Sequence, residues 1–239
     1  MAYLTGFHAI EERLKVSAAN CALLAAKPGP RAREIVALAA ARGVRVLRTG
    51  TNELDRISPG HRGLALEVDD GGPAGAFTLE SFLESVSDKK NVLAVMLDEV
   101  TDPHNFGAIL RSCDQFNADI VITRNKRNAR RADTVAKTSA GASAWVPSTE
   151  VANLPRAIEQ LKEAGFWIYG ADMGGSLVYK TRLLGRVCVI LGGEAGLSRL
   201  LHQKCDALIA IPSLGRIDSL NVSVAAGIIL YEIIRQRGA

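Results

Sequence analysis

The sequence predicts an α/β protein whose C-terminal part contains a mostly parallel β-sheet with helices on both faces. From residue 92 to the end of the chain, short apolar runs alternate with segments of helical periodicity, which is typical of such a sheet. The runs at residues 92–97 and 187–191 are uninterrupted, as in strands buried on both faces. Residues 69–77, rich in glycine and proline, have no periodicity and predict an interdomain linker.

The part before this linker is expected to be a small α/β unit. Its expected elements are helices at residues 6–15, 31–42 and 52–57 and strands at residues 21–25, 44–47 and 64–68. Gly43 follows the second helix, as a C-terminal glycine commonly does. We therefore place a first domain at residues 1–70, a linker and first helix at residues 71–90, and the second domain at residues 91–239.

In the second domain, strands and helices alternate to the C-terminus. The expected strands lie at residues 92–97, 120–123, 144–146, 167–171, 187–191 and 208–211. The expected helices lie at residues 79–86, 108–116 and 154–164, with a last helix from Val222 onward. Asn153 is the expected N-cap of the third. Apolar residues at helical spacing predict that the last helix is buried: Val222, Ala225, Ala226, Ile229 and Ile233.

The composition is that of an ordinary soluble globular protein, with 48% hydrophobic and 23% charged residues. A net charge of +4 is mildly basic and does not by itself decide whether the protein binds nucleic acid. The four cysteines form no C-x-x-C pair, and no histidine lies at ligand spacing from them, which favours reduced thiols in a cytosolic protein without zinc. Neither a membrane-spanning run nor a secretory signal is evident.

Three loops follow the ends of expected strands, at residues 98–111, 192–198 and 212–223. Because ligands of parallel sheets bind at the carboxyl ends of the strands, we expect these loops to form one site. Gly192, Gly193 and Gly196 fit a tight turn as well as a ligand-binding loop. No G-x-G-x-x-G follows the first strand and G-x-x-x-x-G-K-[ST] is absent, so a Rossmann site is disfavoured and a P-loop is excluded.

Three polar residues in these loops have both a structural and a functional interpretation. Asn221 or Ser219 could simply cap the last helix, or they could contribute to a site at its start. Arg111 could be a surface arginine with its stem packed on the sheet. Its planar guanidinium is also well suited to bind a phosphate beside the strand ends.

A basic segment follows the expected strand at residues 120–123. Between residues 123 and 137 the only acid is Asp133, and the cations are Arg124, Lys126, Arg127, Arg130, Arg131 and Lys137. Such a run is usually a solvated charged surface. Here its position beside the expected site favours contact with a nucleic-acid backbone, without implying base recognition.

Several of these motifs resemble one family. DEVTDPHNFGAILRSCDQF, VILGGEAGLS and IPSLGRIDSLNVSVAAGIILYEIIRQR are similar to the three motifs of the SpoU, or TrmH-like, RNA ribose 2'-O-methyltransferases. The order and spacing agree from about residue 92 to residue 237. GFHAIEERL and HRGLALEV resemble the small L30e-like RNA-binding domain of the subgroup that methylates guanosine in 23S ribosomal RNA. Asn117, Ser213 and Arg216 depart from the family's usual residues.

The resemblance implies a SPOUT-type fold with a deep C-terminal trefoil knot, preceded by an L30e-like substrate-binding domain. It also implies a cytoplasmic homodimer that uses S-adenosylmethionine as methyl donor. The implied substrate is structured RNA, with 23S rRNA favoured. The implied cofactor-binding residues are Gly192, Ile211 and Leu220, with a glycine loop at residues 171–175 nearby. The implied RNA-binding residues are those of the basic segment: Arg124, Lys126, Arg127, Arg130 and Arg131.

The residues implied to be catalytic are Asn105, Arg111, Glu194, Ser219 and Asn221. An arginine, with its pKa above about 12, is a poor general base. We therefore expect Arg111 to hold an RNA phosphate and stabilise developing alkoxide charge, while the other four orient Arg111, the loops and the ribose. Two alternatives are a transfer RNA ribose methyltransferase and a noncatalytic RNA-binding protein. The N-terminal unit favours ribosomal RNA, and the presence of Arg111 and Asn221 favours an enzyme.

Overall fold

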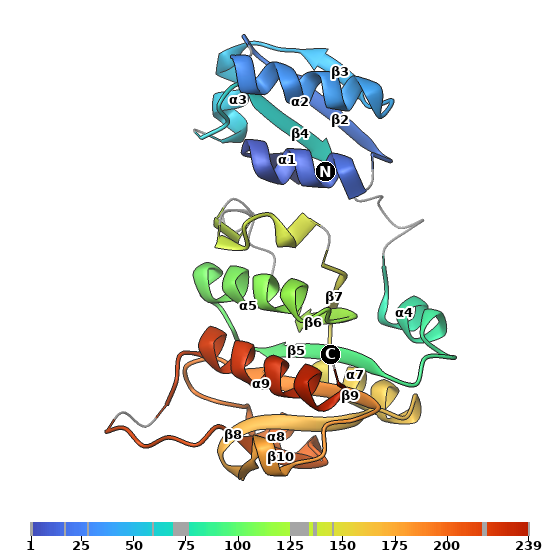
Figure 1. Ribbon diagram of the computed structural model, residues 1–239, viewed down its shortest axis with the longest axis vertical. Helices are drawn as coiled ribbons and strands as arrows, with labels where there is room; N and C mark the ends of the chain where they lie inside the picture. The colour runs from blue at the N-terminus through green and yellow to red at the C-terminus, as the bar shows by residue number, and fades with distance from the viewer. Residues whose placement is uncertain are drawn as a thin grey trace. The chain divides into compact units, whose positions relative to one another are not determined.

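A computed structural model describes residues 2–16, 18–27, 29–58, 60–68, 77–124, 134–135, 138–144, 146–216 and 219–238. The chain forms two compact units (Figure 1). Unit 1 comprises Met1–Ala76 with Asn128–Trp145, and unit 2 comprises Phe77–Arg127 with Val146–Ala239. In the described part of the chain, no helix is long and apolar enough to cross a membrane.

The described elements of unit 1 build a four-stranded sheet with three helices. In chain order the elements are β1 (Ala2–Thr5), α1 (Phe7–Val16), β2 (Cys21–Ala25), α2 (Pro30–Ala41), β3 (Arg45–Arg48), α3 (Thr51–Ile57) and β4 (Leu64–Val68). The strand order is β1-β4-β2-β3, in which only β2 and β3 are parallel. The expected helices and strands are present. The short β1 was not predicted, because four residues carry too little pattern to reveal a strand.

Unit 2 contains a six-stranded, fully parallel sheet of order β10-β8-β9-β5-β6-β7. Its strands are β5 (Val92–Asp98), β6 (Ile120–Arg124), β7 (Ser148–Val151), β8 (Trp167–Leu177), β9 (Arg186–Gly192) and β10 (Ala207–Ala210). Its helices are α4 (Leu79–Ser85), α5 (Pro103–Gln115), α7 (Leu154–Glu163), α8 (Arg199–Lys204) and α9 (Val222–Gln236), with a 3₁₀ turn at Val178–Lys180. The predicted parallel sheet is therefore confirmed.

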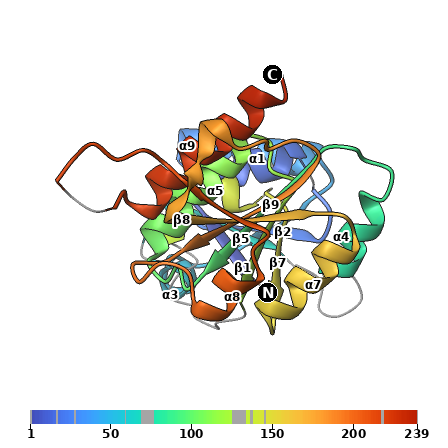
Figure 2. The same ribbon diagram turned by 90° about the horizontal axis from the view of Figure 1, so that it is seen from below.

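Helices cover both faces of this sheet. Figure 2 shows α5 and α9 on one side and α4, α7 and α8 on the other. On the second side, Phe82 of α4 and Ile158 of α7 join Met96 of the central strand β5 in one fully or almost fully buried cluster. Cys113 of α5 and Cys188 of β9 are also buried, and burial raises the pKa of Cys113 to about 12.

Three details correct the expected elements. The prediction of a strand at residues 144–146 is wrong. Ala142–Ala144 is a 3₁₀ helix, and strand β7 begins after Pro147, whose carbonyl oxygen accepts a hydrogen bond from Val121 N. Helix α5 begins at Pro103 rather than residue 108, because the Asp102 carboxylate accepts from the first free backbone N–H groups. The short helix α8 was not predicted.

Strand β8 is longer than expected and contains the segment expected as a glycine loop, residues 171–175. Its register with β10 shifts between Leu208 and Ile209. A Cβ at Gly175 would lie 2.5 Å from the Leu208 carbonyl carbon, so only glycine allows the two backbones to approach this closely. These glycines therefore shape a strand beside the site rather than a turn.

Candidate functional site

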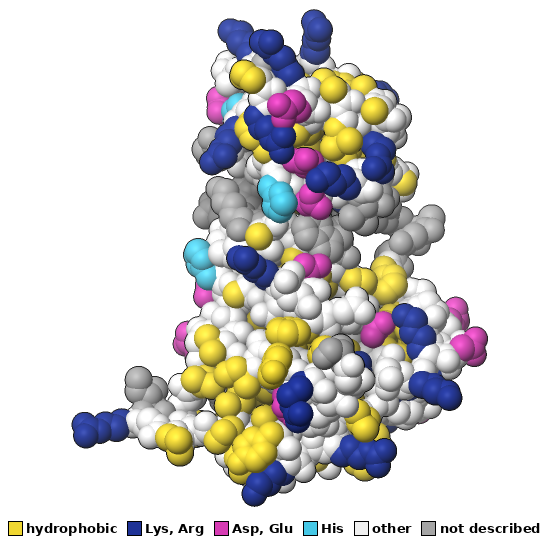
Figure 3. Space-filling model, viewed as in Figure 1, with side chains coloured by type: hydrophobic (Ala, Val, Ile, Leu, Met, Phe, Trp, Pro, Cys, Tyr) yellow, Lys and Arg dark blue, Asp and Glu magenta, His cyan; other side chains and the backbone are white. Residues whose placement is uncertain are grey.

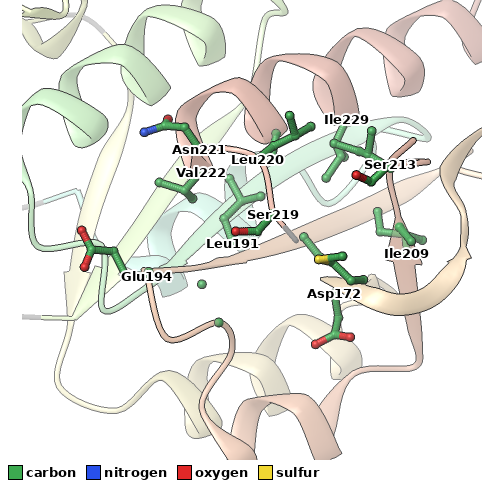
Figure 4. A pocket seen from close by; sticks show the side chains of 18 of the residues that line it. Asp172, Leu191, Glu194, Ile209, Ser213, Ser219, Leu220, Asn221, Val222 and Ile229 are labelled. Carbon is green, nitrogen blue, oxygen red and sulfur yellow. The ribbon is translucent and has the colours of Figure 1, made fainter. Parts of the chain in front are cut away.

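A cavity of about 550 Å³ lies at the carboxyl ends of β9 and β10 (Figure 4). It is lined by Asn105, Ala171, Asp172, Met173, Leu191, Gly192, Gly193, Glu194, Ala195, Gly196, Ile209, Ala210, Ile211, Ser213, Ser219, Leu220, Asn221, Val222, Ala225 and Ile229. All three of the predicted loops contribute residues. The structure thus brings the three loops together around one cavity.

Asp98, the last residue of β5, holds the glycine loop in place. Its carbonyl accepts from Gly193 N at 2.8 Å and its carboxylate accepts from Ser198 N at 2.7 Å, although the two segments are about 100 residues apart in sequence. The Asp98 side chain is buried, with a residue exposure of 5%. The buried carboxylate accepts a hydrogen bond from the loop's backbone and thereby holds the loop in place as part of the cavity wall.

The glycines of this loop allow a backbone approach that no side chain would permit. A Cβ at Gly192 would lie 2.3 Å from the carbonyl carbon of Gly196, and one at Gly193 would lie 2.5 Å from the Glu99 carbonyl oxygen. Gly196 has φ +76°, a conformation that favours glycine. The loop is therefore a tight turn and also the wall of a cavity, so both interpretations of its glycines hold.

Asn221 connects the last loop to the first. Its side-chain oxygen accepts from Ser223 N at 2.8 Å, which makes it the N-cap of α9. Its amide nitrogen donates to the side-chain oxygen of Asn105 at 2.9 Å, across 116 residues of sequence. The predicted cap is confirmed, and the same side chain joins two loops of the site. Ser219 and Leu220 line the cavity next to it.

Ile211 and Leu220, two of the residues expected to bind a cofactor, line the cavity together with Gly192. Ile209 and Ile229 add further apolar wall. The combination of apolar side chains and exposed loop backbone fits a flat heterocycle that also makes backbone hydrogen bonds. Glu194 also lines the cavity, and in Figure 4 it lies at the margin away from Ile209, with its carboxylate directed outward.

Asp172 is a cavity residue within segment 171–175, which was expected near the cofactor, but the sequence did not single it out. It lies within β8, and its carboxylate accepts from Gly174 N at 2.8 Å. The other carboxylate oxygen is 3.9 Å from His202 Nε2. Its neighbours were expected to form a glycine loop after a strand, and the acid in that stretch was the signal that could have found it.

The expected RNA-contacting residues are located only in part. Arg111 lies on α5, exposed to solvent, and is not among the residues that line the cavity. Arg124 is exposed at the end of β6. Lys126, Arg127, Arg130 and Arg131 lie outside the described residues. Among the described residues, no group of three or more His, Cys, Asp or Glu side chains could hold a metal ion.

The far end of α9 is fixed by a polar network to the connection between β8 and β9. Glu232 is buried and accepts two hydrogen bonds of 2.8 Å from Arg235, and Gln236 donates to it at 2.8 Å. Arg235, followed by Gln236, holds the pKa of the Glu232 carboxyl at about 2. Gln236 also binds the backbone of Thr181 and Leu183. This network fixes the helix whose first turn closes the cavity.

Two family models match the chain. Residues 92–231 match the SpoU rRNA Methylase family, and residues 3–71 match a domain described as RNA 2'-O ribose methyltransferase substrate binding. A protein of Borreliella burgdorferi named an uncharacterized tRNA/rRNA methyltransferase is 42% identical over 218 residues, which cover 88% of this chain and 96% of that protein. The 23S rRNA (guanosine-2'-O-)-methyltransferase RlmB of Neisseria meningitidis is 38% identical over 239 residues, covering 97% of this chain and 94% of the relative.

Among solved structures, the SpoU methyltransferase AviRb from Streptomyces viridochromogenes, in complex with the cofactor AdoMet, is similar to the whole chain. Its TM-score is 0.77 at 25% sequence identity, and the match covers 98% of this chain and 89% of that one. Every residue that lines the cavity falls within the segment matched by the larger family model. The chain belongs to the SpoU rRNA methylase family.

Proposed function

We propose that this protein transfers a methyl group from S-adenosylmethionine to a ribose 2'-hydroxyl in structured RNA, a guanosine of 23S rRNA. The observation that carries the proposal is the cavity, in which three loops distant in sequence bring together Asn105, Glu194, Ser219 and Asn221, four of the five residues implied to be catalytic. The near full-length similarity to 23S rRNA guanosine methyltransferases supports this substrate. An enzyme acting on ribosomal RNA would work in the cytoplasm.

The cavity fits the proposed methyl donor. Gly192 exposes backbone at its wall, and Ile211 and Leu220 supply apolar surface for an adenine ring. When bound, S-adenosylmethionine supplies an electrophilic methyl group on a sulfonium. In this proposal Gly192, Ile211 and Leu220 hold the donor, and the close packing of the loop keeps their backbone in one geometry.

The chain's own polar residues orient the RNA. Asn105 and Asn221, joined at 2.9 Å, fix the first and third loops to each other. Ser219 and Glu194 line the same cavity and orient the ribose and the loop. Arg111, exposed on α5 outside the cavity, binds the phosphate next to the target ribose and stabilises negative charge developing on the 2'-oxygen.

The RNA is held by unit 1 and by the basic segment at residues 124–131. In unit 1, the exposed cations Lys27 and Arg62 both have positive φ, at 42° and 50°, in turns at the same end of the sheet. Ala26 N donates to Gly63 O at 3.0 Å, which joins the two turns. Non-glycine residues in this strained conformation gather at functional sites. This supports an L30e-like RNA-binding domain at residues 1–70, followed by a linker and a methyltransferase domain at residues 91–239.

A homodimer and a trefoil knot are further parts of the proposal. Val224, Ile228 and Tyr231 repeat at helical spacing on the outer face of α9 and are 49%, 38% and 56% exposed. Figure 3 shows hydrophobic side chains gathered over this helix. A second copy of the chain would cover them. For the knot, the support is that Ile211 and Ser213, after edge strand β10, and Ser219 to Asn221, before α9, line the same cavity as the glycine loop, and that α9 packs beside α5.

The proposal is tested by incubating the protein with methyl-labelled S-adenosylmethionine and, separately, unmodified 23S rRNA and transfer RNA. We expect label in 23S rRNA. Arg111→Lys should lower the single-turnover rate at saturating RNA at least tenfold, because lysine cannot form a bidentate contact with phosphate. A near wild-type rate for Arg111→Lys would contradict the role of Arg111. Binding of the donor without transfer to either RNA would instead favour a noncatalytic RNA-binding protein.

A further inference from the structure

We propose that Asp172 and Glu194 make the cavity selective for the positively charged methyl donor over the uncharged product of the reaction. The inference rests on the proposed function and deepens it, since it concerns how the same cavity distinguishes S-adenosylmethionine from S-adenosylhomocysteine. The two molecules share adenine, ribose and amino acid groups. They differ by the methyl group and by the positive charge on sulfur.

The charged side chains in the described cavity wall are all negative. Among the described residues that line the cavity, Asp172 and Glu194 carry carboxylates and none is a lysine, arginine or histidine. The remainder of the wall is apolar side chain, small polar side chain and backbone. A concave surface of one sign with apolar walls concentrates the field and favours a ligand of opposite charge.

The two carboxylates come from different strands. Asp172 belongs to β8 and Glu194 follows β9, and Figure 4 shows them at different margins of the cavity with their carboxylates directed outward. Both side chains are open to solvent, so a ligand that fills the cavity experiences a partly screened negative field from both of them. At neutral pH the donor carries a net charge of +1, from its sulfonium, ammonium and carboxylate, whereas the product carries none. Only the donor gains from the additional attraction.

The position of Asp172 is fixed without neutralising its charge. The backbone N–H of Gly174, an uncharged donor, forms a 2.8 Å hydrogen bond with one carboxylate oxygen. The other carboxylate oxygen lies 3.9 Å from His202 Nε2, which is charged only when protonated. Since Asp172 has a side-chain exposure of 34%, its effect is screened by solvent, and we expect a contribution of about three- to tenfold in affinity.

A purely structural role for Asp172 predicts a different result. If its carboxylate only shapes β8 through Gly174, its loss would weaken the binding of donor and product equally. Asp172→Asn is suited to separate the two roles, because its amide oxygen can still accept from Gly174 N while the charge is removed. Asp172→Glu keeps the charge and changes the geometry. Asp88→Asn, at an exposed position in the loop after α4, is the matched control for loss of one negative charge.

The experiment is isothermal titration of the full-length wild type and these three variants with S-adenosylmethionine and with S-adenosylhomocysteine, at low and high salt. We expect Asp172→Asn to weaken donor binding by about three- to tenfold and product binding by less than about twofold. Asp88→Asn should change neither, and Asp172→Glu should recover most of the selectivity. The loss caused by Asp172→Asn should shrink at high salt, where charges are screened.

Equal weakening of both ligands by Asp172→Asn would overturn the inference, as would unchanged binding of both. Circular dichroism of each variant establishes that it is folded. If the folded wild type bound neither ligand, the proposed function itself would fail. That outcome is distinct from intact binding of both ligands without selectivity, which would contradict only the role of Asp172 and Glu194.

Discussion

At the scale of single residues, the site depends on polar side chains that each join segments far apart in the sequence. Asp98 binds the glycine loop, and Asn221 binds both the first turn of α9 and Asn105. These bonds fix the relative positions of loops that have little regular structure. Removing one partner should therefore disturb the site more than it disturbs the fold.

Asn221→Ala tests this directly. It should lower the free energy of unfolding by about 1 kcal/mol through loss of the helix cap, and lower the methyl-transfer rate at least tenfold through loss of the contact with Asn105. Asn153→Ala is the matched control, because Asn153 caps α7 in the same way by accepting from Arg156 N. The control should lose similar stability and keep its transfer rate. A parallel loss of rate in both variants would show that the effect of Asn221 is one of stability alone.

Glu232 gives the protein a pH-dependent contribution to stability. Its pKa is lowered from 4.5 to about 2 by Arg235 and Gln236, so the carboxylate is favoured in the folded state. The resulting stability is fully present above about pH 4.5 and is lost as the pH falls toward 2. Glu232→Gln should cost about 1–2 kcal/mol at pH 7.

Urea unfolding of the wild type and Glu232→Gln between pH 7 and pH 3 measures this contribution. The difference in unfolding free energy should narrow as the pH falls below about 4.5. Glu163→Gln, at an exposed position of α7, should change stability little at any pH in this range. A difference for Glu232→Gln that stays constant down to pH 3 would exclude the proposed linkage.

The residue-level predictions from sequence were most successful where side-chain chemistry was local. Asn153 was identified as a cap, and Asn221 as one of two candidate caps with Ser219, because polar residues before an apolar helix commonly cap it. The bond between Asn105 and Asn221 could not be predicted from spacing, since it depends on how two loops meet. Asp172 fell within segment 171–175, which was expected near the cofactor, but the segment was interpreted as a loop because glycine and acid side chains are uncommon in strands such as β8.

At the scale of elements, the glycine loop after β9 sets the shape of the cavity. Gly192→Ala should abolish or strongly weaken binding of S-adenosylmethionine, because its Cβ would overlap the Gly196 backbone and force the loop to move. Gly227→Ala on α9 is a suitable control. Its Cβ would meet only the Ser112 hydroxyl oxygen, at an ordinary 3.7 Å, and alanine favours the helix.

Titration with S-adenosylmethionine should therefore separate the two alanine variants. The control should bind with wild-type affinity and melt at an equal or higher temperature. Wild-type affinity in Gly192→Ala would mean that the loop can move without cost and is not part of the binding site.

The positions of buried strands were predictable from the sequence, whereas the ends of several elements and the edge strand β7 were less so. Strands β5 and β9 are uninterrupted apolar runs, and both match the predicted positions closely. The ends of β8 and the start of α5 depend on the neighbouring β10 backbone and on the Asp102 cap. Strand β7 carries only four residues, and the apolar segment before Pro147 resembled a strand more than β7 itself.

At the scale of the whole molecule, the exposed apolar face of α9 is the feature that a single chain does not explain. Val224, Ile228 and Tyr231 would be covered in the proposed homodimer. Ile228→Glu should shift the protein from dimer to monomer in sedimentation experiments, because it places a charge in an apolar contact. Leu200→Glu, at a 51% exposed position of α8, should leave the dimer intact. A wild-type monomer, or equal dissociation by both variants, would contradict the proposed interface.

The central claim is that the cavity formed by the loops after β5, β9 and β10 is the site of ribose methylation. Its most direct test is mass spectrometry of nuclease fragments from unmodified 23S rRNA treated with S-adenosylmethionine and either the wild type or Asn221→Ala. The wild type should produce 2'-O-methylguanosine at one position, and the variant should produce at least tenfold less in the same time. Absence of ribose methylation by a wild type that binds S-adenosylmethionine, or equal product from both proteins, would contradict the claim.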